Sequence, residues 1–406
     1  MTRVLVAGWV GSTNLGDELV LAGVLRSLRQ VFGPELAVAA VSVDPPATRR
    51  IHGVATIDHR RPDMLLSAAR SADLVVIGGG GLIQDETSPF NLPYHLSRAW
   101  LATLAGTPWI GLALGVGRLE TGLGTTLART LSRARAVTVR DEPSLALLEG
   151  LGVPATLAAD AAFHLATGPT APDAPQGARI APASHRMSSP PEVEVDGLAS
   201  TGRRPDHLDD VLTVSLRPWA GPGGLLPVGW RRSTGSLDDA MVAPAAAALD
   251  RAADRTGLTV RFVALQTDRD AALHAAIAAR MRTPTQLVVP DVTSVLEAVG
   301  RGRVVVAMRY HAAVAATLAG RPSVLLGYSP KVDALAATLG IGARLQPVDP
   351  EALAGLDEAI VAQLDAEEPG VRAVVDARDR LLGRAKVNLD VLRAVTGGEA
   401  PSGQGR

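Results

Sequence analysis

The sequence predicts an α/β protein with two doubly wound, Rossmann-like domains that face each other across a cleft. Three observations lead to this prediction. The chain has 406 residues, more than one hydrophobic core usually serves, so two domains are expected. Short runs of Val, Leu, Ile and Ala alternate with longer helical patterns, which is typical of βαβ units and parallel sheets. The alternation stops once, in a segment rich in Pro, Ser, Ala and Gly, and then resumes.

This interruption sets the predicted domain boundaries. Residues 1–167 form the first domain and residues 209–395 the second. Residues 168–208 are expected to be a linker or insertion, because such a density of Pro, Ser and Gly disfavours regular structure. Residues 396–406 lack a pattern and are expected to be a disordered tail.

Each expected strand is a short aliphatic run that ends in Gly or polar residues, where open parallel sheets place their ligands. The helix expected over 16–32 repeats Leu19, Leu25 and Leu28 on one face, another covers 236–255, and one or two charged amphipathic helices follow Pro350. The candidate strands are 3–9, 36–43, 73–79, 109–115 and 136–141 in the first domain, and 211–219, 259–268, 286–291, 303–311 and 323–329 in the second.

The composition excludes several kinds of chemistry. The chain has no cysteine, so disulfides, thiolate nucleophiles and Cys-ligated metals are ruled out. The eight histidines show no HExxH or paired spacing, so no metal site is expected, and no P-loop or GxSxG motif is present. Forty basic and 41 acidic residues give a formal charge of -1, which offers no general attraction for nucleic acid.

We expect the protein in the cytoplasm. Its first strand passes directly into Gly, Asn and Asp, unlike a secretory signal. No uncharged apolar stretch reaches the roughly 18–20 residues that span a bilayer. Peripheral contact with the inner face of the cell membrane would follow from a lipid-linked substrate, although no basic amphipathic helix stands out. The sequence leaves the oligomeric state open.

The segment GSTNLGDE follows the first strand and opens a helix. One interpretation is a simple turn in which Asn14 or Asp17 caps the helix, and the adjacent Asp17 and Glu18 suit the helix dipole. The other is sugar binding, since amides and carboxylates bond to hydroxyls, with one of the acids as a general base.

Further candidate residues for the same side of the cleft follow other strands. Four consecutive glycines, ending in Gly80 and Gly81, are costly to order and would let the backbone approach a ligand, with Gln84 and Asp85 directly after them. In the second domain, Gln266 and Asp268 end a strand, where they either orient a sugar or merely terminate the strand.

A stronger constellation lies in the second domain. Arg217 and Arg309 each follow a strand, and a guanidinium there presents a planar fork suited to phosphate or carboxylate. His311 opens an alanine-rich helix whose N-terminal amides add positive potential; alone it would be taken for a buried hydrogen-bonding residue. Lys331 is either a third cation or an ordinary surface lysine. Beside these residues stand Tyr310 and Tyr328.

Taken in order, these segments resemble the polysaccharide pyruvyl transferase family, most closely the CsaB-type bacterial enzymes of secondary cell-wall polymers. The resemblance runs from Val4 to about Gly340, and Tyr310 stands where many relatives have Leu. Two such domains also have the layout of GT-B glycosyltransferases, an analogy of architecture alone. The matching segments are GSTNLGDE, GGGGLIQD, GVG, VTVRDEPS, DAAF, SLRPW, QTDRD, MRYHAAVAATLAGRPSV and GYSPKVD.

The resemblance implies that phosphoenolpyruvate donates a pyruvyl group, as a ketal, to two hydroxyls of a sugar, N-acetylmannosamine in the CsaB-type enzymes. It implies His311 as general acid, Arg217 and Arg309 as clamps on the donor, and Lys331 as a further anion contact, with Tyr310 and Tyr328 on the donor side. Asp17 is the expected acceptor-side base. No cofactor is expected, since phosphoenolpyruvate is a co-substrate, and the other partner is a sugar or polysaccharide, lipid-linked or not.

Two alternatives remain open at this stage. One is a GT-B nucleotide-sugar glycosyltransferase that uses the same cleft, with Arg309 and Lys331 on a diphosphate. The other is a non-catalytic sugar-phosphate binding protein, which would bind ligand without turnover. Donor choice separates the first alternative from the pyruvyl transferase, and turnover separates the second.

Overall fold

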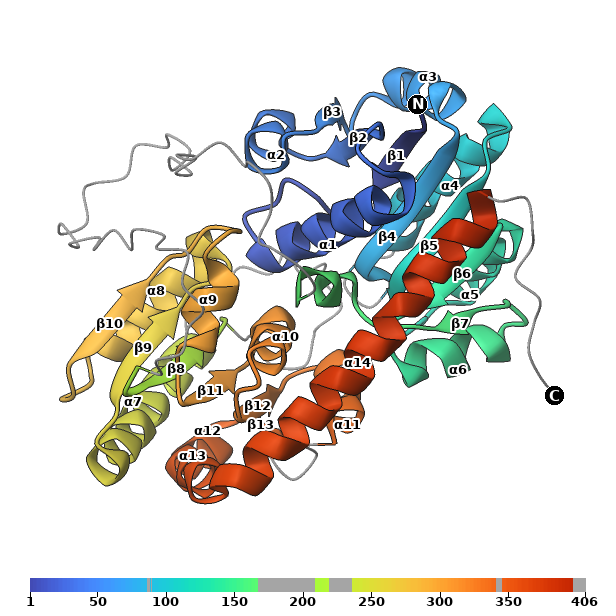
Figure 1. The fold of residues 1–406 in the computed structure, drawn as a ribbon. Helices are drawn as coiled ribbons and strands as arrows, with labels where there is room; N and C mark the ends of the chain where they lie inside the picture. Colours follow the sequence, from blue (N-terminus) through green and yellow to red (C-terminus); the bar gives the residue numbers. More distant parts are fainter. Residues whose placement is uncertain (86–87, 89, 167–208, 219–235, 341–344, 397–406) are drawn as a thin grey trace.

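The computed structural model describes residues 1–85, 88, 90–166, 209–218, 236–340 and 345–396 (Figure 1). The expected linker at 168–208 and the expected tail beyond residue 396 lie outside these residues.

The first domain contains a sheet of seven parallel strands in the order β3-β2-β1-β4-β5-β6-β7. The order reverses direction at β1, so the carboxyl ends of β1 and β4 flank the point where such sheets bind ligands. The strands are β1 (Arg3–Ala7), β2 (Ala37–Ser42), β3 (Ala55–Asp58), β4 (Leu74–Ile83), β5 (Trp109–Val116), β6 (Ala136–Val139) and β7 (Thr156–Leu157).

Helices cover both faces of this sheet (Figure 1). One core lies between the sheet and α1, and a second core lies between the opposite face and α3, α4, the α5–η1 segment and α6. The helices of this domain are α1 (Leu15–Phe32), α2 (Pro45–His52), α3 (Pro62–Ser71), α4 (Asn91–Ala105), α5 (Gly122–Ala128), η1 (Arg129–Arg133), α6 (Glu142–Gly150) and η2 (Ala161–Ala166).

The second domain repeats the plan with six parallel strands in the order β10-β9-β8-β11-β12-β13. One face packs on α7, α8, α12 and α13, and the other on α9, α10, α11 and α14. Its strands are β8 (Val211–Ser215), β9 (Thr259–Val263), β10 (Thr285–Val288), β11 (Val304–Ala307), β12 (Ser323–Gly327) and β13 (Leu345–Pro347). Its helices are α7 (Ser236–Thr256), α8 (Thr267–Ala278), α9 (Val295–Gly300), α10 (Tyr310–Leu318), α11 (Pro330–Leu339), α12 (Pro350–Ala354), α13 (Leu356–Asp365) and α14 (Glu367–Thr396).

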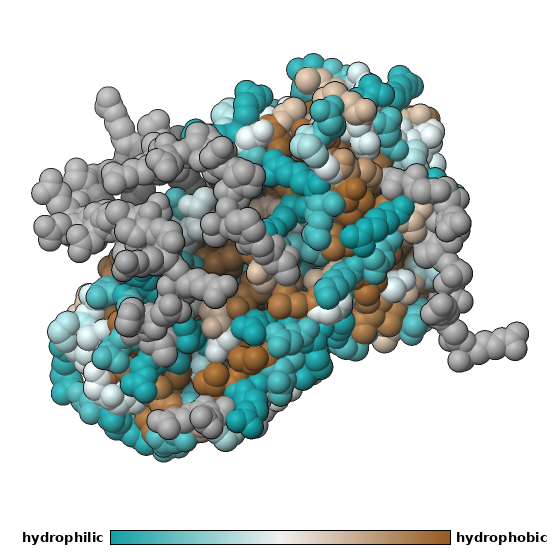
Figure 2. Space-filling view, viewed as in Figure 1, coloured by the Kyte–Doolittle hydropathy of each residue, from teal (hydrophilic) through white to brown (hydrophobic). Residues whose placement is uncertain are grey.

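The fold class expected from the sequence is therefore confirmed: two parallel-sheet α/β domains of the same winding. Leu15 and Phe163 of the first domain belong to the same hydrophobic core as α10 and α11 of the second, so the domains are packed against each other at their seam. In the space-filling view, hydrophobic residues are visible where the two domains meet (Figure 2).

Three details differ from the expectation. The strands β3, β7 and β13 were not expected; each has at most four residues and lies at or near a sheet edge. Three helices follow Pro350 where one or two were expected. The four glycines at 78–81 lie inside β4, with a register shift against β5 between Gly80 and Ile83, so they form an irregular strand end.

The long helix α14 joins the two domains a second time. It begins beside the second sheet and runs back across the first domain (Figure 1). Its first half contributes Ala377 and Leu381 to the shared core, and its last turns place Leu392 in the core under α1. Buried Asn388 donates to the carbonyl of Ala159 (3.1 Å) and accepts from the hydroxyl of Thr138 (2.7 Å).

Candidate functional site

The carboxyl edges of the two sheets meet at the start of α1. The amide of Leu15 donates to the carbonyl of Leu265 over 2.7 Å, and Asn14 and Gln266 form an antiparallel β-bridge. The hydroxyl of Thr13 donates to Asp268 Oδ1 over 2.6 Å. The structure thus brings together Asn14, Gln266 and Asp268, which lie in different domains.

Asn14 also caps α1, since its side-chain oxygen accepts from the amide of Gly16. The capping interpretation of this residue is correct, and it does not conflict with a role at the seam, because the amide nitrogen of Asn14 points to Asp17 over 2.8 Å.

His311 is the second residue of α10 and is buried against the first domain. Gly16 of α1 lies directly against its ring, and a Cβ added at Gly16 would overlap Nδ1. The other ring nitrogen, Nε2, is 3.8 Å from Oδ1 of Asp160, an ion pair when the ring is protonated. Within the described residues this buried Nε2 has no hydrogen-bond partner.

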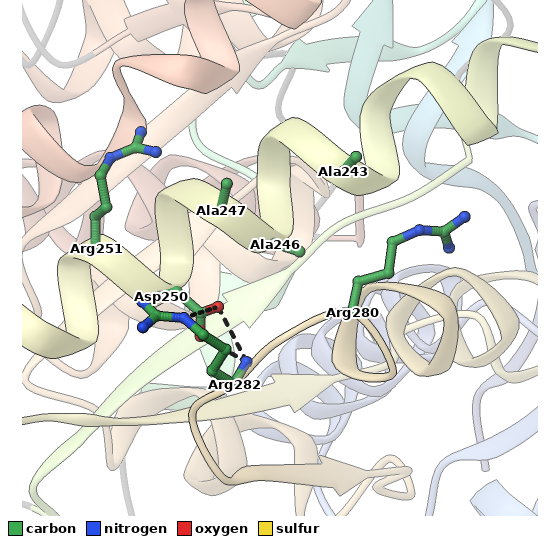
Figure 3. Close-up of a pocket in the computed structure, with 7 residues that line it drawn as sticks. All are labelled: Ala243, Ala246, Ala247, Asp250, Arg251, Arg280 and Arg282. Carbon is green, nitrogen blue, oxygen red and sulfur yellow. Dashed lines mark hydrogen bonds and ion pairs between the residues drawn. The ribbon is translucent and has the colours of Figure 1, made fainter.

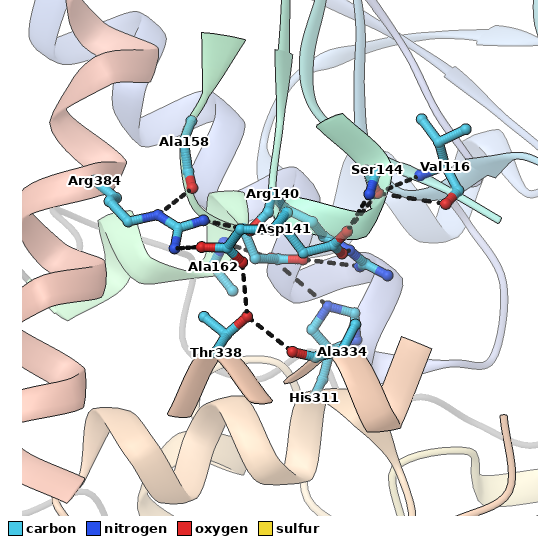
Figure 4. Close-up of polar contacts among 12 residues, drawn as sticks. Val116, Arg140, Asp141, Ser144, Ala158, Ala162, His311, Ala334, Thr338 and Arg384 are labelled. Carbon is cyan, nitrogen blue, oxygen red and sulfur yellow. Dashed lines mark hydrogen bonds and ion pairs between the residues drawn. The ribbon is translucent and has the colours of Figure 1, made fainter. Parts of the chain in front are cut away.

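Asp160 is itself firmly held by Arg140 and by the backbone of Ala162, both labelled with His311 in Figure 4. One oxygen accepts from Arg140 Nη1 over 3.1 Å, and the other accepts from the amide of Ala162 over 3.0 Å. Burial raises the pKa of this carboxyl, but His311, Arg140 and the Ala162 amide lower it more, so the net pKa lies well below its ordinary value. Asp160 is therefore ionised at neutral pH and faces the imidazole of His311.

Tyr310 points away from the other donor-side residues. Its ring is buried under Arg140 of the first domain, with the guanidinium carbon 4.1 Å from the ring centre, a cation–π contact. Gly115 leaves room for that guanidinium, because a Cβ at this position would lie only 2.8 Å from Arg140 Cζ. Tyr310 thus fixes Arg140 and, through it, Asp160, and no contact with Arg217 or Lys331 involves it in the described residues.

Asp17 lies in the first turn of α1 on the same side as His311. One of its oxygens accepts from the hydroxyl of Ser12 (3.1 Å) and from the side-chain amide of Asn14 (2.8 Å). Burial raises the pKa of this carboxyl above its ordinary value, although His311, Ser12 and Asn14 act in the opposite direction. A carboxylate with a raised pKa accepts a proton more readily, as a general base must.

The donor-side residues form a cationic cluster around one phenol. Arg217 Nη1 donates to the hydroxyl of Tyr328 over 3.2 Å, and its guanidinium carbon lies 4.8 Å from the ring centre. Lys331 Nζ lies 5.6 Å from the same centre. Burial raises the pKa of Tyr328, but Lys331, Arg217 and Arg309 together lower it by more, so the net pKa falls from its ordinary value to about 8. This shift reports a strongly positive local potential, as an anion site requires.

Arg309 bridges the cluster and the seam. Its Nε and Nη2 bind the carboxylate of Asp270, which is completely buried, and Nη2 also donates to Gln266 Oε1 over 2.9 Å. Two edges of this guanidinium are thus occupied by protein, so a clamp on the donor would have to use Nη1.

The remaining candidates serve the fold in this structure. Glu18 is buried and accepts from the amide of Gly11 (2.9 Å) and pairs with His52 Nε2 (2.7 Å). Asp85 accepts from the amides of Glu120 (2.6 Å) and Thr121 (3.1 Å), which ties β4 to the loop before α5. Gln84 is buried next to it.

Gly80 and Gly81, unlike the residues just described, border open space. Gly80 has φ of 84°, a conformation that favours glycine, and no atom lies within 4 Å of the place of its missing Cβ. Gly81 is exposed, with Arg140 Nη2 3.9 Å from that place. Both glycines leave open space at the carboxyl end of β4.

A hollow of about 470 Å³ lies elsewhere, on the outer side of α7 (Figure 3). It is lined by α7 residues and by Arg280 and Arg282, and Asp250 binds the Arg282 amide within it. These arginines follow α8, at the amino-edge end of the domain, so the hollow lies away from the seam.

The sequence did not single out Asp160, Arg140 and Asp270 as site residues, although all three occur in segments that carry the family resemblance. The available signal was physical: a buried arginine at a strand end needs a buried carboxylate partner. Which carboxylate supplies it depends on tertiary packing, since Asp160 follows β7 and Asp270 lies in α8.

Comparison with known proteins identifies the family. Residues 14–330 match the family model for polysaccharide pyruvyl transferases. No curated protein matches the chain in sequence. Similar solved structures include the S. aureus MnaA-UDP co-structure (10% identity, TM-score 0.61, 100% of both chains) and UDP-GlcNAc 2-epimerase from Methanocaldococcus jannaschii (9%, 0.59, 98% of this chain and 100% of that one).

A third similar structure is the spinosyn rhamnosyltransferase SpnG with spinosyn aglycone (13% identity, TM-score 0.50, 97% of this chain and 100% of that one). At these identities the structures establish a shared GT-B-like fold, whereas the family model covers most of the sequence. The chain belongs to the polysaccharide pyruvyl transferase family, a family of transferases.

Proposed function

We propose that this protein transfers a pyruvyl group from phosphoenolpyruvate to two hydroxyls of a sugar, forming a ketal and releasing phosphate. The single observation that carries the proposal is the cationic cluster of Arg217, Lys331 and Arg309 around Tyr328, beside the buried His311. A compact positive cluster next to an imidazole suits a small, highly charged enol phosphate.

The donor binds at the cluster. Arg217 and Lys331 contact its phosphate and carboxylate and offset the charge that develops as phosphate departs. Arg309, held by Asp270 and Gln266, adds Nη1 and its charge to the same potential. The donor's methylene carbon then lies toward His311.

The reaction starts with protonation. His311 gives a proton to the methylene carbon, and C2 of the donor becomes an oxocarbenium-like electrophile. One sugar hydroxyl adds to C2 and loses its proton to Asp17. The bond between C2 and the phosphate oxygen then breaks, the second hydroxyl adds to C2, and its proton returns to His311, while the proton held by Asp17 leaves with phosphate. Two C–O bonds, one C–H bond and one O–H bond of phosphate form, and the C=C π bond, the C–O bond to phosphate and two sugar O–H bonds are lost.

The acceptor lies on the first-domain side. Asn14 pairs there with Gln266 and donates to Asp17, and Asp268 accepts from Thr13. Gly80 and Gly81 leave room at the end of β4. Hydroxyls and acetamido groups pair well with carboxylates and amides. From the family resemblance we propose N-acetylmannosamine of a cell-wall polysaccharide as the acceptor.

The test is to incubate the purified protein with phosphoenolpyruvate and saccharides that contain N-acetylmannosamine, following phosphate release and product mass. We expect acceptor-dependent phosphate release and a product with the mass of a pyruvate ketal. Arg217→Ala should raise KM for phosphoenolpyruvate at least about tenfold, since charged hydrogen bonds contribute roughly 1.5–3 kcal/mol.

The matched control is Arg280→Ala, which removes an arginine from the hollow beside α7 and should leave KM unchanged. Binding of a nucleotide sugar in place of phosphoenolpyruvate would instead make the protein a glycosyltransferase. Binding of phosphoenolpyruvate with no turnover on any acceptor would favour a non-catalytic sugar-phosphate binding protein.

A further inference from the structure

The outward face of α4 is unusual for a surface helix. Its buried side packs on the first sheet through Leu92, Leu96 and Ala99. Among the fifteen residues of α4, Arg98 is the one that carries a charge, and its side chain is buried. The outward side exposes Trp100 (36%) and Leu104 (69%), one turn apart, and Phe90 (76%) directly precedes the helix. Surface helices normally carry charges on this side.

The next helix extends this apolar strip. Helix α5 contacts α4 and exposes Leu123 (65%) in its first turn. Asp85, which follows β4, binds the backbone just before α5, and Asn91 at the start of α4 donates to the carbonyls of Leu82 and Gln84. These bonds tie the starts of both helices to the carboxyl edge of the sheet. The strip therefore begins beside the candidate site and runs along the domain.

Arginines lie in the segments that adjoin this strip. Residues 90–135 contain five arginines and one acidic residue, Glu120, in a chain whose formal charge is -1. One of the five is the buried Arg98. The side chains of the other four are exposed and make no ion pair or hydrogen bond within the part of the chain that the structure describes: Arg118, Arg129, Arg133 and Arg135.

We propose that this surface, formed by the outward sides of α4 and the α5–η1 segment, docks on an anionic lipid bilayer. Trp, Phe and Leu side chains enter the interface between headgroups and acyl chains, and arginines around them bind anionic headgroups. A second copy of the chain fits less well, because a two-fold contact would place these arginines opposite one another with Glu120 alone to offset them.

The sequence does not display this surface, because its two halves lie in different segments. The apolar residues belong to α4 and the start of α5, and three of the arginines follow in η1 and the turn after it. Neither α4 nor η1 combines the exposed apolar residues with the exposed arginines by itself. None of the described helices is long and apolar enough to cross a membrane, so the surface would act by docking.

The test is co-sedimentation with vesicles of phosphatidylcholine alone or with phosphatidylglycerol, at low and high salt. We expect binding to the anionic vesicles that weakens with salt. Phe90→Glu/Leu104→Glu should weaken it by roughly tenfold or more, and Arg129→Gln/Arg133→Gln by roughly tenfold.

Two matched doubles serve as controls and should bind like the unchanged protein. Leu287→Glu/Val289→Glu adds the same charges at exposed apolar residues of the second domain, and Arg50→Gln/Arg280→Gln removes two arginines elsewhere. Thermal melts check that each variant folds. The proposal fails if anionic vesicles are not bound or if the controls lose binding equally. It also fails if Phe90→Glu/Leu104→Glu converts a dimer to a monomer, by light scattering, without changing vesicle binding.

Discussion

Tyr328 reports on the cationic cluster through its own ionisation. The chain has three tyrosines, and burial raises the pKa values of Tyr94 and Tyr310. Tyr328 alone is lowered, to about 8. We therefore expect one tyrosine to ionise near pH 8, measured as tyrosinate absorbance in the near ultraviolet. The step should vanish in Tyr328→Phe and move to higher pH in Lys331→Met, because a cation that favours the phenolate is removed.

The same group predicts the pH dependence of donor binding. Below about pH 8 the phenol is neutral and the cluster keeps its full positive charge; above it, a phenolate offsets one charge and repels an anionic donor. KM for phosphoenolpyruvate should therefore rise above pH 8 in the unchanged protein. Steady-state kinetics between pH 7 and about 9.5 would check this. A profile equally steep in Tyr328→Phe would rule Tyr328 out as the cause.

Asp160 should position His311 without touching substrate. Asp160→Asn keeps the shape and the bond to Arg140, but it removes the negative charge that faces the imidazole and the oxygen that accepts from the Ala162 amide. We expect kcat to fall by about 10²-fold in steady-state kinetics, with KM for phosphoenolpyruvate little changed. An unchanged kcat, or a loss confined to KM, would contradict this role.

The residue types at the strand ends predicted one part of this site, the arginines that could bind an anion, but not their partners. Arginines after β8 and β11 predicted an anion site because few side chains other than arginine present a planar fork there. Their partners were not predictable. Arg309 meets Asp270 and His311 meets Asp160 only after the sheets are wound and docked, and nothing local in the sequence distinguishes those two acids from ordinary helix-start or loop residues.

At the scale of elements, α1 carries the proposed base, Asp17, and also approaches the second domain closely. Gly16 lets its first turn lie against the ring of His311. Gly16→Ala should displace the ring and lower kcat by at least tenfold, as roughly expected for a misplaced acid. Gly383→Ala in α14, where nothing lies within 4 Å of the added Cβ, is the matched control and should raise stability by about 0.5–1 kcal/mol. Activity assays with thermal melts compare the two, and equal activity in both would show that the contact with His311 is unimportant.

Elements were predictable in proportion to their burial. β1, β4, β5, β8 and β11 are central and read as unbroken aliphatic runs, since both faces are covered. β7 and β13 are sheet edges of two and three residues, too short to show any period. The strand expected over 73–79 was too short, because glycine weakens strands and the run of glycines continues to residue 81, but β5 supplies a partner that extends β4 to Ile83.

At the scale of the whole molecule, the site exists only while the domains stay docked. His311 and Gln266 belong to the second domain, and Asp160, Gly16 and Asn14 to the first. The shared core at the seam and the return of α14 hold them together. This long-range packing could not be predicted from the sequence, because the charged pattern after Pro350 indicates amphipathic helices without indicating which domain they cover.

A substitution at Asn388 tests how firmly α14 is held against the first domain. Asn388→Ala removes the partner of the Ala159 carbonyl and of the Thr138 hydroxyl, both buried in the first domain. Each unpaired buried group costs about 1–3 kcal/mol, so we expect the free energy of unfolding to fall by about 2–4 kcal/mol. Lys386→Ala, exposed on the same helix, should change it by less than about 0.5 kcal/mol. Urea unfolding followed by circular dichroism and by tryptophan fluorescence measures both. Because α14 packs on both domains, the two signals should change together in the unchanged protein. Separate transitions would mean that the domains unfold independently and that α14 does not couple them.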